Sequence, residues 1–180
     1  MKALLGFFSG LILFLLGCGA DAPVQPNVLL FTLDTLRADA LGCYGEAREH
    51  TPALDSLARE GVLFEDAICQ IPATLTSHTA ILTGRHPKTT GVRFAKVPVP
   101  PAEQTLAERF ALARYDTAAF LSSLVLAPEF GLDQGFKNYD LGSMRSGEHT
   151  GAPERRAQET IDAALAFLQT ERDRPFFLWI

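Results

Sequence analysis

The chain has 180 residues, of which 47% are hydrophobic and 9% aromatic, and its formal net charge is −5. This composition is typical of a globular protein with a packed core and argues against intrinsic disorder. The negative charge, with no basic helix or row of stacking aromatics, argues against nucleic acid as a partner. The length suits one medium-sized α/β domain or part of a larger one.

Residues 1–18 have the pattern of a bacterial lipoprotein signal peptide. A positive start at Lys2 is followed by an apolar core over residues 3–16 and by small residues that lead to Cys18. We predict that cleavage leaves Cys18 as the lipidated first residue, that residues 19–26 form a linker, and that the lipid holds the exported protein at the membrane of the cell envelope. The alternative is an ordinary cleaved secretory signal, which would leave a periplasmic or extracellular protein.

The run from Val28 to Leu33 is almost entirely apolar and stops at Asp34. Such a run is too short to span a membrane, and it is typical of a strand buried on both faces of a parallel sheet. We therefore predict a buried central strand with Asp34 at its carboxyl end. Ligands of open α/β sheets bind at that edge.

The rest of the chain alternates between helical and extended patterns. In chain order we predict a helix over 52–60, a strand or extended return over 62–64 and 67–69, a helix over 78–83, a helix over 106–113 with a capping box, a buried strand over 117–121, loops over 131–139 and 142–153, a helix over 157–168 and a strand over 175–180. This alternation predicts an α/β fold with a doubly wound, mostly parallel sheet flanked by helices.

The segment from Pro72 to His78 places hydroxyls and an imidazole at the start of an apolar helix. We predict Ser77 as the helix cap, which puts Thr74 just before a helix amino terminus, where free N–H groups favour bound anions. We expect this segment to meet Asp34 in space. Taken singly, each residue also fits an ordinary structural role. Asp34 fits a turn or cap, Thr74 a hydroxyl that bonds to the backbone, and His78 a side chain at the helix start whose hydrogen bonds are satisfied. Together, a carboxylate that can hold a divalent metal and a threonine that the metal can activate indicate an ester-cleaving site.

Five cationic or imidazole side chains follow at close spacing: Arg85, His86, Lys88, Arg93 and Lys96. Each one alone is typical of a solvated loop. As a group beside a helix terminus they suit an anionic substrate.

Cys43 and Cys69 would meet an oxidising compartment in an exported protein. The sequence does not decide between a disulfide and two free thiols, because it does not establish the geometry that a disulfide needs. Cys69 lies in an apolar run, so we expect a buried free thiol there.

Residues 27–45, 51–61 and 82–87 carry three separated motifs in a fixed order, with weaker similarity over 104–139 and 163–180. In these segments the chain resembles the sulfatase family, within the alkaline-phosphatase-like superfamily. The resemblance implies an alkaline-phosphatase-like fold. It also implies that everything after the linker, residues 27–180, is the amino-terminal part of a catalytic domain, truncated at its carboxyl end and inactive alone.

The resemblance implies roles for single residues. Asp34 matches a metal-ligating aspartate, and Thr74 stands where a typical sulfatase has the cysteine of Cys-x-Pro-Ser-Arg, which is oxidised to formylglycine. Threonine cannot become formylglycine. Ser77 alone keeps the pattern, His78 stands at the arginine position, and Thr35 replaces the second aspartate usual in sulfatases.

Threonine is the nucleophile in other members of the superfamily, including nucleotide pyrophosphatase/phosphodiesterases, whose Thr-Phe-Pro-Asn-His pattern is similar to residues 74–78, and phosphoglycerol transferases. The resemblance therefore leaves sulfuryl and phosphoryl transfer open. It implies calcium for a true sulfatase and zinc or manganese for the threonine relatives, with further metal ligands after residue 180.

The function predicted is a metal-assisted hydrolase of sulfuric or phosphoric esters. In the implied mechanism Thr74 and Asp34 bind the metal, Thr74 attacks the ester, and backbone N–H groups near Ser77, with His78, hold the equatorial oxygens. Arg85 is the candidate for binding the anionic group of a small ester or sulfated glycan. The alternatives are a phosphodiesterase or phosphoglycerol transferase of the same superfamily, and a non-catalytic surface lipoprotein with this fold.

The lipoprotein prediction is tested at Cys18. A fatty-acid probe fed to cells should label the wild-type protein, whereas Cys18→Ala should carry no label because the thioether can no longer form. Cys69→Ala is the matched control and should label like the wild type. Equal labelling of the wild type and Cys18→Ala would contradict the prediction.

Overall fold

The computed structural model describes residues 25–45, 50–94, 96–146 and 153–180. The signal peptide, Cys18 and most of the linker lie outside these ranges. Within the described ranges, no helix has the length and apolar character needed to cross a membrane.

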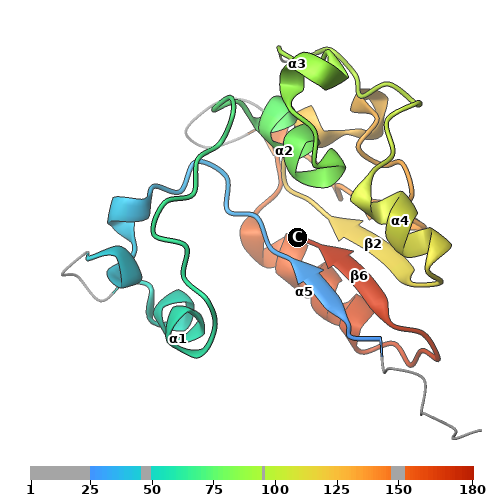
Figure 1. Ribbon diagram of the computed structural model, residues 1–180. Coiled ribbons are helices and arrows are strands. Elements are labelled where there is room, and N and C mark those ends of the chain that lie inside the picture. The colour runs from blue at the N-terminus through green and yellow to red at the C-terminus, as the bar shows by residue number, and fades with distance from the viewer. Residues whose placement is uncertain (1–24, 46–49, 95, 147–152) are drawn as a thin grey trace, which may run out of the picture.

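A four-stranded parallel sheet forms the centre of the molecule (Figure 1). The strand order is β1-β6-β2-β3, and each neighbouring pair is parallel. The strands are β1 (Val28–Leu30), β2 (Asp116–Phe120), β3 (Asn138–Asp140) and β6 (Phe176–Trp179). A separate antiparallel ribbon pairs β4 (Arg145–Ser146) with β5 (Pro153–Glu154).

Helices cover both faces of the sheet. The α-helices are α1 (Pro52–Glu60), α2 (Thr74–Thr83), α3 (Pro87–Thr90), α4 (Leu106–Leu112) and α5 (Ala157–Leu168). Short 3-10 turns are η1 (Ala38–Ala40), η2 (Gly42–Tyr44), η3 (Leu124–Leu126) and η4 (Pro128–Phe130). The predicted α/β class, with a parallel sheet between helices, is confirmed.

The two central strands divide their side chains between two cores. Phe177 and Trp179 of β6 are fully buried in one core with Leu75 of α2 and Ala107 of α4. Leu178, between them in sequence, faces the other core with residues of β2 and α5. This alternation is the period-two geometry of a strand. It places α2 and α4 on one face of the sheet and α5 on the other.

The predicted helices over 52–60 and 157–168 are confirmed, and the predicted helix after Thr105 is confirmed with its capping box. Strand β3 was missed, because the sequence over 131–139 reads as a loop. Its three residues form a strand only because they pair with Ala118, Ala119 and Phe120 of β2.

The prediction of a buried central strand over 28–33 is wrong. The strand stops at Leu30, and among the described strands it pairs with β6 alone, so it lies at the edge of this sheet. Leu29 is 54% exposed, Phe31 45% and Leu33 46%. The apolar pattern suits burial on both faces, but no described element covers these side chains.

Of the two alternatives for 62–64 and 67–69, a strand or an extended return, the strand is wrong. The segment contains no strand, and Val62, Phe64 and Ile68 are more than two-thirds exposed, at 82%, 70% and 86%. Cys69 is exposed rather than buried because this segment runs outside the core, and Cys43 is half-buried. Both thiols are free.

The buried cap of α4 gives a test of the fold. Thr105 is fully buried; its Oγ1 accepts from the Glu108 N–H at 3.1 Å and donates to the Gln134 carbonyl at 2.8 Å. Thr105→Val keeps the shape and removes both bonds, so we expect a loss of about 1–3 kcal/mol in the free energy of unfolding. Urea denaturation of the complete protein measures it.

The control for this test is Thr170→Val. The Thr170 hydroxyl is exposed and donates to the Ala166 carbonyl at 3.3 Å, so its loss should change stability by less than about 0.5 kcal/mol. Equal stability of the two variants would show that the buried cap does not anchor α4.

Candidate functional site

Thr74 and Asp34 meet beyond the carboxyl ends of the strands, although 40 residues separate them in the sequence. The Thr74 Oγ1 donates a hydrogen bond to Asp34 Oδ2 at 2.7 Å, and the pair is open to solvent. The predicted meeting of these two segments is therefore confirmed. A hydroxyl and a carboxylate on two different elements now share one point at the ligand-binding edge of the sheet.

Asp34 is held by the register of β1 and by a tight turn. Just before it, the Thr32 N–H donates to the Ile180 carbonyl at 2.7 Å, which extends the pairing of β1 with β6. Just after it, Thr35 has φ of 58°, in the left-handed region. A β-branched residue there is strained by about 1–3 kcal/mol. The chain thus turns sharply directly after the carboxylate.

Thr74 is the first residue of α2, which corrects the predicted start of this helix at His78. Ala73 occupies the N-cap position with no side-chain cap, and the Ser77 N–H donates to the Ala73 carbonyl at 2.8 Å. Ser77 is therefore a helix residue and not the cap. The N–H groups without intrahelical partners are those of Thr74, Leu75 and Thr76, and they favour an anion at this end.

His78 lies one turn into α2 and is 6% exposed. Its Nδ1 lies 2.8 Å from the Thr74 carbonyl oxygen, and its ring centroid lies 5.5 Å from that of Trp179. The structure thus brings His78 to the backbone of Thr74, the candidate nucleophile.

Thr76 is a feature of the site that sequence reasoning did not single out. It is fully buried, and within the described part of the chain its Oγ1 has no hydrogen-bond partner. Thr79 and Thr83 of the same helix donate to the carbonyls of Leu75 and Thr79. Each of these hydroxyls bonds to the carbonyl four residues earlier. For Thr76 that residue is Pro72, which precedes the helix, so Thr76 does not make the equivalent bond.

Arg85 follows the opposite end of α2 from Thr74. A helix of 10 residues is about 15 Å long, so the structure does not bring Arg85 to the candidate nucleophile. Its guanidinium instead donates to Glu103 Oε2 at 2.9 Å. The other four cationic or imidazole side chains of this stretch are exposed on and around α3: His86, Lys88, Arg93 and Lys96.

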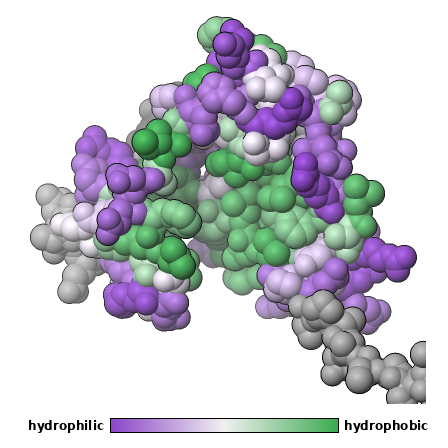
Figure 2. Space-filling view, in the orientation of Figure 1, coloured by the Kyte–Doolittle hydropathy of each residue, from purple (hydrophilic) through white to green (hydrophobic). Residues whose placement is uncertain are grey.

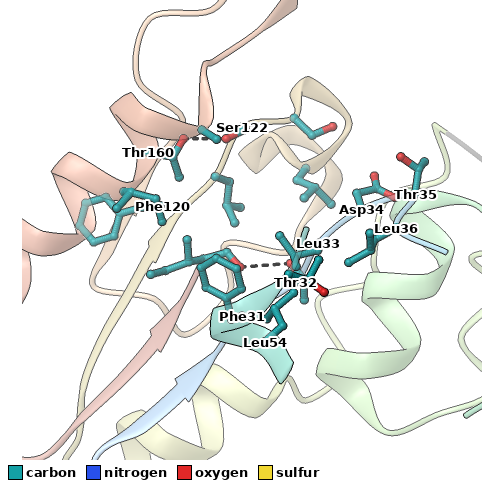
Figure 3. A pocket seen from close by; sticks show the side chains of 17 residues that line it. Phe31, Thr32, Leu33, Asp34, Thr35, Leu36, Leu54, Phe120, Ser122 and Thr160 are labelled. Atoms are coloured by element: carbon teal, nitrogen blue, oxygen red, sulfur yellow. Dashed lines mark hydrogen bonds between the residues drawn. The ribbon is translucent and has the colours of Figure 1, made fainter. Parts of the chain in front are cut away.

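A hollow of about 920 Å³ opens beside Asp34. Figure 2 shows apolar surface on both sides of it, on the sheet and on the segment that carries α1. In Figure 3, Asp34 and Thr35 lie at one end, and the hydrogen-bonded hydroxyls of Ser122 and Thr160, 2.6 Å apart, lie at another. Among the described residues of its lining, Asp34 is the one ionisable side chain. The size is that of a ligand pocket, and the wall is mainly apolar.

A sequence model of the sulfatase family matches residues 26–180. The chain belongs to the sulfatase family. Over 98 residues it is 37% identical to an ulvan-active sulfatase of Formosa agariphila, a match that covers 54% of this chain and 19% of that protein. The chain therefore spans about a fifth of the length of this curated relative.

Two solved structures share the fold. One is a protein in complex with its substrate, D-glucosamine-2-N,6-O-disulfate; it matches with a TM-score of 0.70 at 24% identity, over 86% of this chain and 33% of that one. The other is a phosphonate monoester hydrolase of Agrobacterium radiobacter, with a TM-score of 0.68 at 19% identity, over 86% and 40%. The predicted alkaline-phosphatase-like fold is confirmed.

Members of the sulfatase family bind a divalent metal, and two side chains of this chain fit one. Asp34 and Thr74 offer a carboxylate and a hydroxyl oxygen within hydrogen-bond distance of each other. Oxygen donors are the ligands that hard divalent cations prefer. Within the described ranges, no group of three or more His, Cys, Asp or Glu side chains could hold an ion. Asp34 and Thr74 therefore fit as part of a metal site.

The position of Arg85 in this sulfatase-family chain predicts a structural rather than a binding effect. Arg85→Ala leaves Glu103, whose side chain is only 10% exposed, without its cation. We expect a loss of about 1–3 kcal/mol in the free energy of unfolding and an unchanged KM for an aryl ester. Lys88→Ala, at an exposed position, is the control and should change neither quantity. A tenfold rise in KM for Arg85→Ala at normal stability would restore Arg85 as an anion-binding residue.

Proposed function

We propose that this chain is part of an exported, metal-assisted hydrolase that cleaves sulfuric or phosphoric esters with Thr74 as the nucleophile. The observation that carries this proposal is the 2.7 Å hydrogen bond between Thr74 and Asp34 at the amino terminus of α2. Membership of the sulfatase family supports the class of reaction.

In the proposed reaction the Thr74 Oγ1 attacks the sulfur or phosphorus of the ester. A bond forms between Oγ1 and that atom, the bond to the alcohol oxygen breaks, and the alcohol leaves with one proton. Water then cleaves the Thr74 ester, which restores the hydroxyl and releases sulfate from a sulfate ester, phosphate from a phosphate monoester or a phosphate monoester from a diester. Asp34 orients the attacking oxygen by accepting its hydrogen bond.

The first turn of α2 is suited to the charge that develops on the equatorial oxygens. The N–H groups of Leu75 and Thr76 lie at the amino terminus of a 10-residue helix that has no side-chain cap. Fixed donors of this kind stabilise negative charge without reorganising, and the helix dipole adds to the effect. These donors take the place of the N–H groups near Ser77 in the sequence-based mechanism.

Among the residues that the structure describes, Asp34 and Thr74 are the two that would hold a divalent ion. When bound, such an ion supplies positive charge that lowers the pKa of the hydroxyl and offsets the charge of the ester. The sulfatase family supports calcium, and the threonine in place of the usual cysteine supports zinc or manganese.

A phosphoric ester is the second candidate substrate, and the threonine favours it. Thr74 cannot supply the formylglycine of a typical sulfatase, and a phosphonate monoester hydrolase shares the fold. A sulfated glycan remains the first candidate, because the relatives include an ulvan-active sulfatase and a protein bound to a disulfated glucosamine.

The proposed location is the cell envelope, with the protein attached to the membrane by a lipid on Cys18. The pattern of residues 1–18 supports it. In this proposal residues 19–26 are a linker, and residues 27–180 are the amino-terminal part of the catalytic domain.

The nucleophile is tested by three variants of the complete protein. Thr74→Ala removes the attacking oxygen, so we expect turnover to fall by about 10³-fold or more. Thr76→Ala removes a hydroxyl two residues away, and its turnover should fall far less. Thr74→Cys should also be inactive as a sulfatase, because residues 76 and 78 lack the proline and arginine of the formylglycine motif.

The measurement is kcat/KM on a matched aryl sulfate and aryl phosphate diester. Full activity of Thr74→Ala on both would eliminate the proposed mechanism. Loss of activity in Thr74→Ala, with wild-type preference for the phosphate diester, would keep the mechanism and assign the protein to the phosphodiesterases.

A further inference from the structure

The contacts of His78 differ from those of a residue that binds substrate. The ring is 6% exposed and lies against Trp179 of β6, with the two ring planes 37° apart. Nδ1 lies 2.8 Å from the Thr74 carbonyl oxygen. A carbonyl oxygen can only accept, so Nδ1 carries the hydrogen and donates it.

This hydrogen bond bears on the donors of the first turn. The Thr74 carbonyl and the Leu75 N–H belong to the same planar peptide group and point in opposite directions along the helix. The hydrogen bond from His78 holds the Thr74 carbonyl in place, and it therefore also fixes the direction of the Leu75 N–H at the helix amino terminus. His78 thus acts on an anion-facing donor through the backbone.

Trp179 connects His78 to the other half of the site. The indole Nε1 donates to the Thr32 Oγ1 at 3.1 Å, and Thr32 lies two residues before Asp34. The Thr32 N–H and Oγ1 both donate to the Ile180 carbonyl, at 2.7 Å and 3.2 Å. One chain of contacts therefore runs from the backbone of the nucleophile to the segment that carries the carboxylate.

We propose that His78 is a positioning residue that, through Trp179 and Thr32, holds the first turn of α2 in register with Asp34. The inference rests on the proposed function, since it concerns the same nucleophile. It replaces the expectation that the imidazole itself holds the substrate's oxygens. Thr74 and Asp34 lie on separate elements with a single hydrogen bond between them, and this network links those elements behind the site.

The test compares two substitutions of His78 in the complete, metal-loaded protein. The side-chain amide nitrogen of His78→Asn lies at the same number of bonds from Cα as Nδ1, so it can donate to the Thr74 carbonyl. His78→Gln is larger and fills more of the ring's space, but its amide nitrogen corresponds to Nε2. We expect His78→Asn to keep kcat within about fivefold of wild type and His78→Gln to lose about 10²-fold, with KM unchanged in both.

Thermal unfolding of both variants separates misfolding from misplacement. A general loss of packing would lower the stability and kcat of both variants, whereas the proposal requires His78→Asn to keep the kcat that His78→Gln loses. Equal, large losses of kcat in the two variants at normal stability, or a rise in KM, would show that the imidazole itself contacts the substrate. Wild-type kcat in both would show that His78 does not position the helix.

A milder variant tests the connection to Asp34. Thr32→Val keeps the shape of a partly exposed side chain and removes the acceptor of the Trp179 N–H. We expect kcat to fall about tenfold with KM unchanged. Thr117→Val is the control and should keep the wild-type kcat, because it removes bonds to Gly135 and Lys137 at the start of β2, whereas Asp34 follows the carboxyl end of β1. An unchanged kcat in Thr32→Val would overturn the connection.

These outcomes are separable from failure of the proposed function. If Thr74→Ala is fully active, the nucleophile is wrong and the role of His78 falls with it. If Thr74→Ala is inactive and His78→Asn loses as much kcat as His78→Gln, the nucleophile stands and the positioning role alone is rejected.

Discussion

The structure depends on the burial of β6 between two layers of helices. Phe177, Leu178 and Trp179 are each fully buried, with alternate side chains facing α2 and α4 on one side and α5 on the other. Each such side chain stabilises the fold by about 1.5–3 kcal/mol. Because β6 also pairs with both β1 and β2, it sets the register of the strands that end at the candidate site.

The site is assembled by this arrangement rather than by any single segment. The parallel register of β1 on β6 brings Asp34 to the carboxyl edge, and the packing of α2 on Trp179 brings Thr74 to the same edge. The strained turn at Thr35 and the uncapped start of α2 lie at the two sides of the 2.7 Å contact. Backbone strain and unpaired donors of this kind are typical of functional sites.

The apolar surface is distributed unevenly over the described part of the chain. The body of the sheet is well packed, whereas the segment after β1 and Leu54 of α1 line the hollow with apolar side chains, and apolar surface lies on both sides of it (Figure 2). Apolar surface that lines a hollow is typical of a place where something binds or packs. The carboxylate at its rim connects this surface to the proposed chemistry.

The sequence by itself determined the class of fold, most helices and the two side chains that meet at the candidate site. Helices with local signals were predictable, such as the capping box at Thr105 and the glycine after Thr83, because a cap depends on neighbours within one turn. The resemblance to sulfatases pointed to Asp34 and Thr74. Only the tertiary structure decided that α2 starts at Thr74, that β1 is an edge strand, that Arg85 pairs with Glu103, and that His78 packs on Trp179. These features depend on contacts between residues far apart in the chain, which no local pattern records.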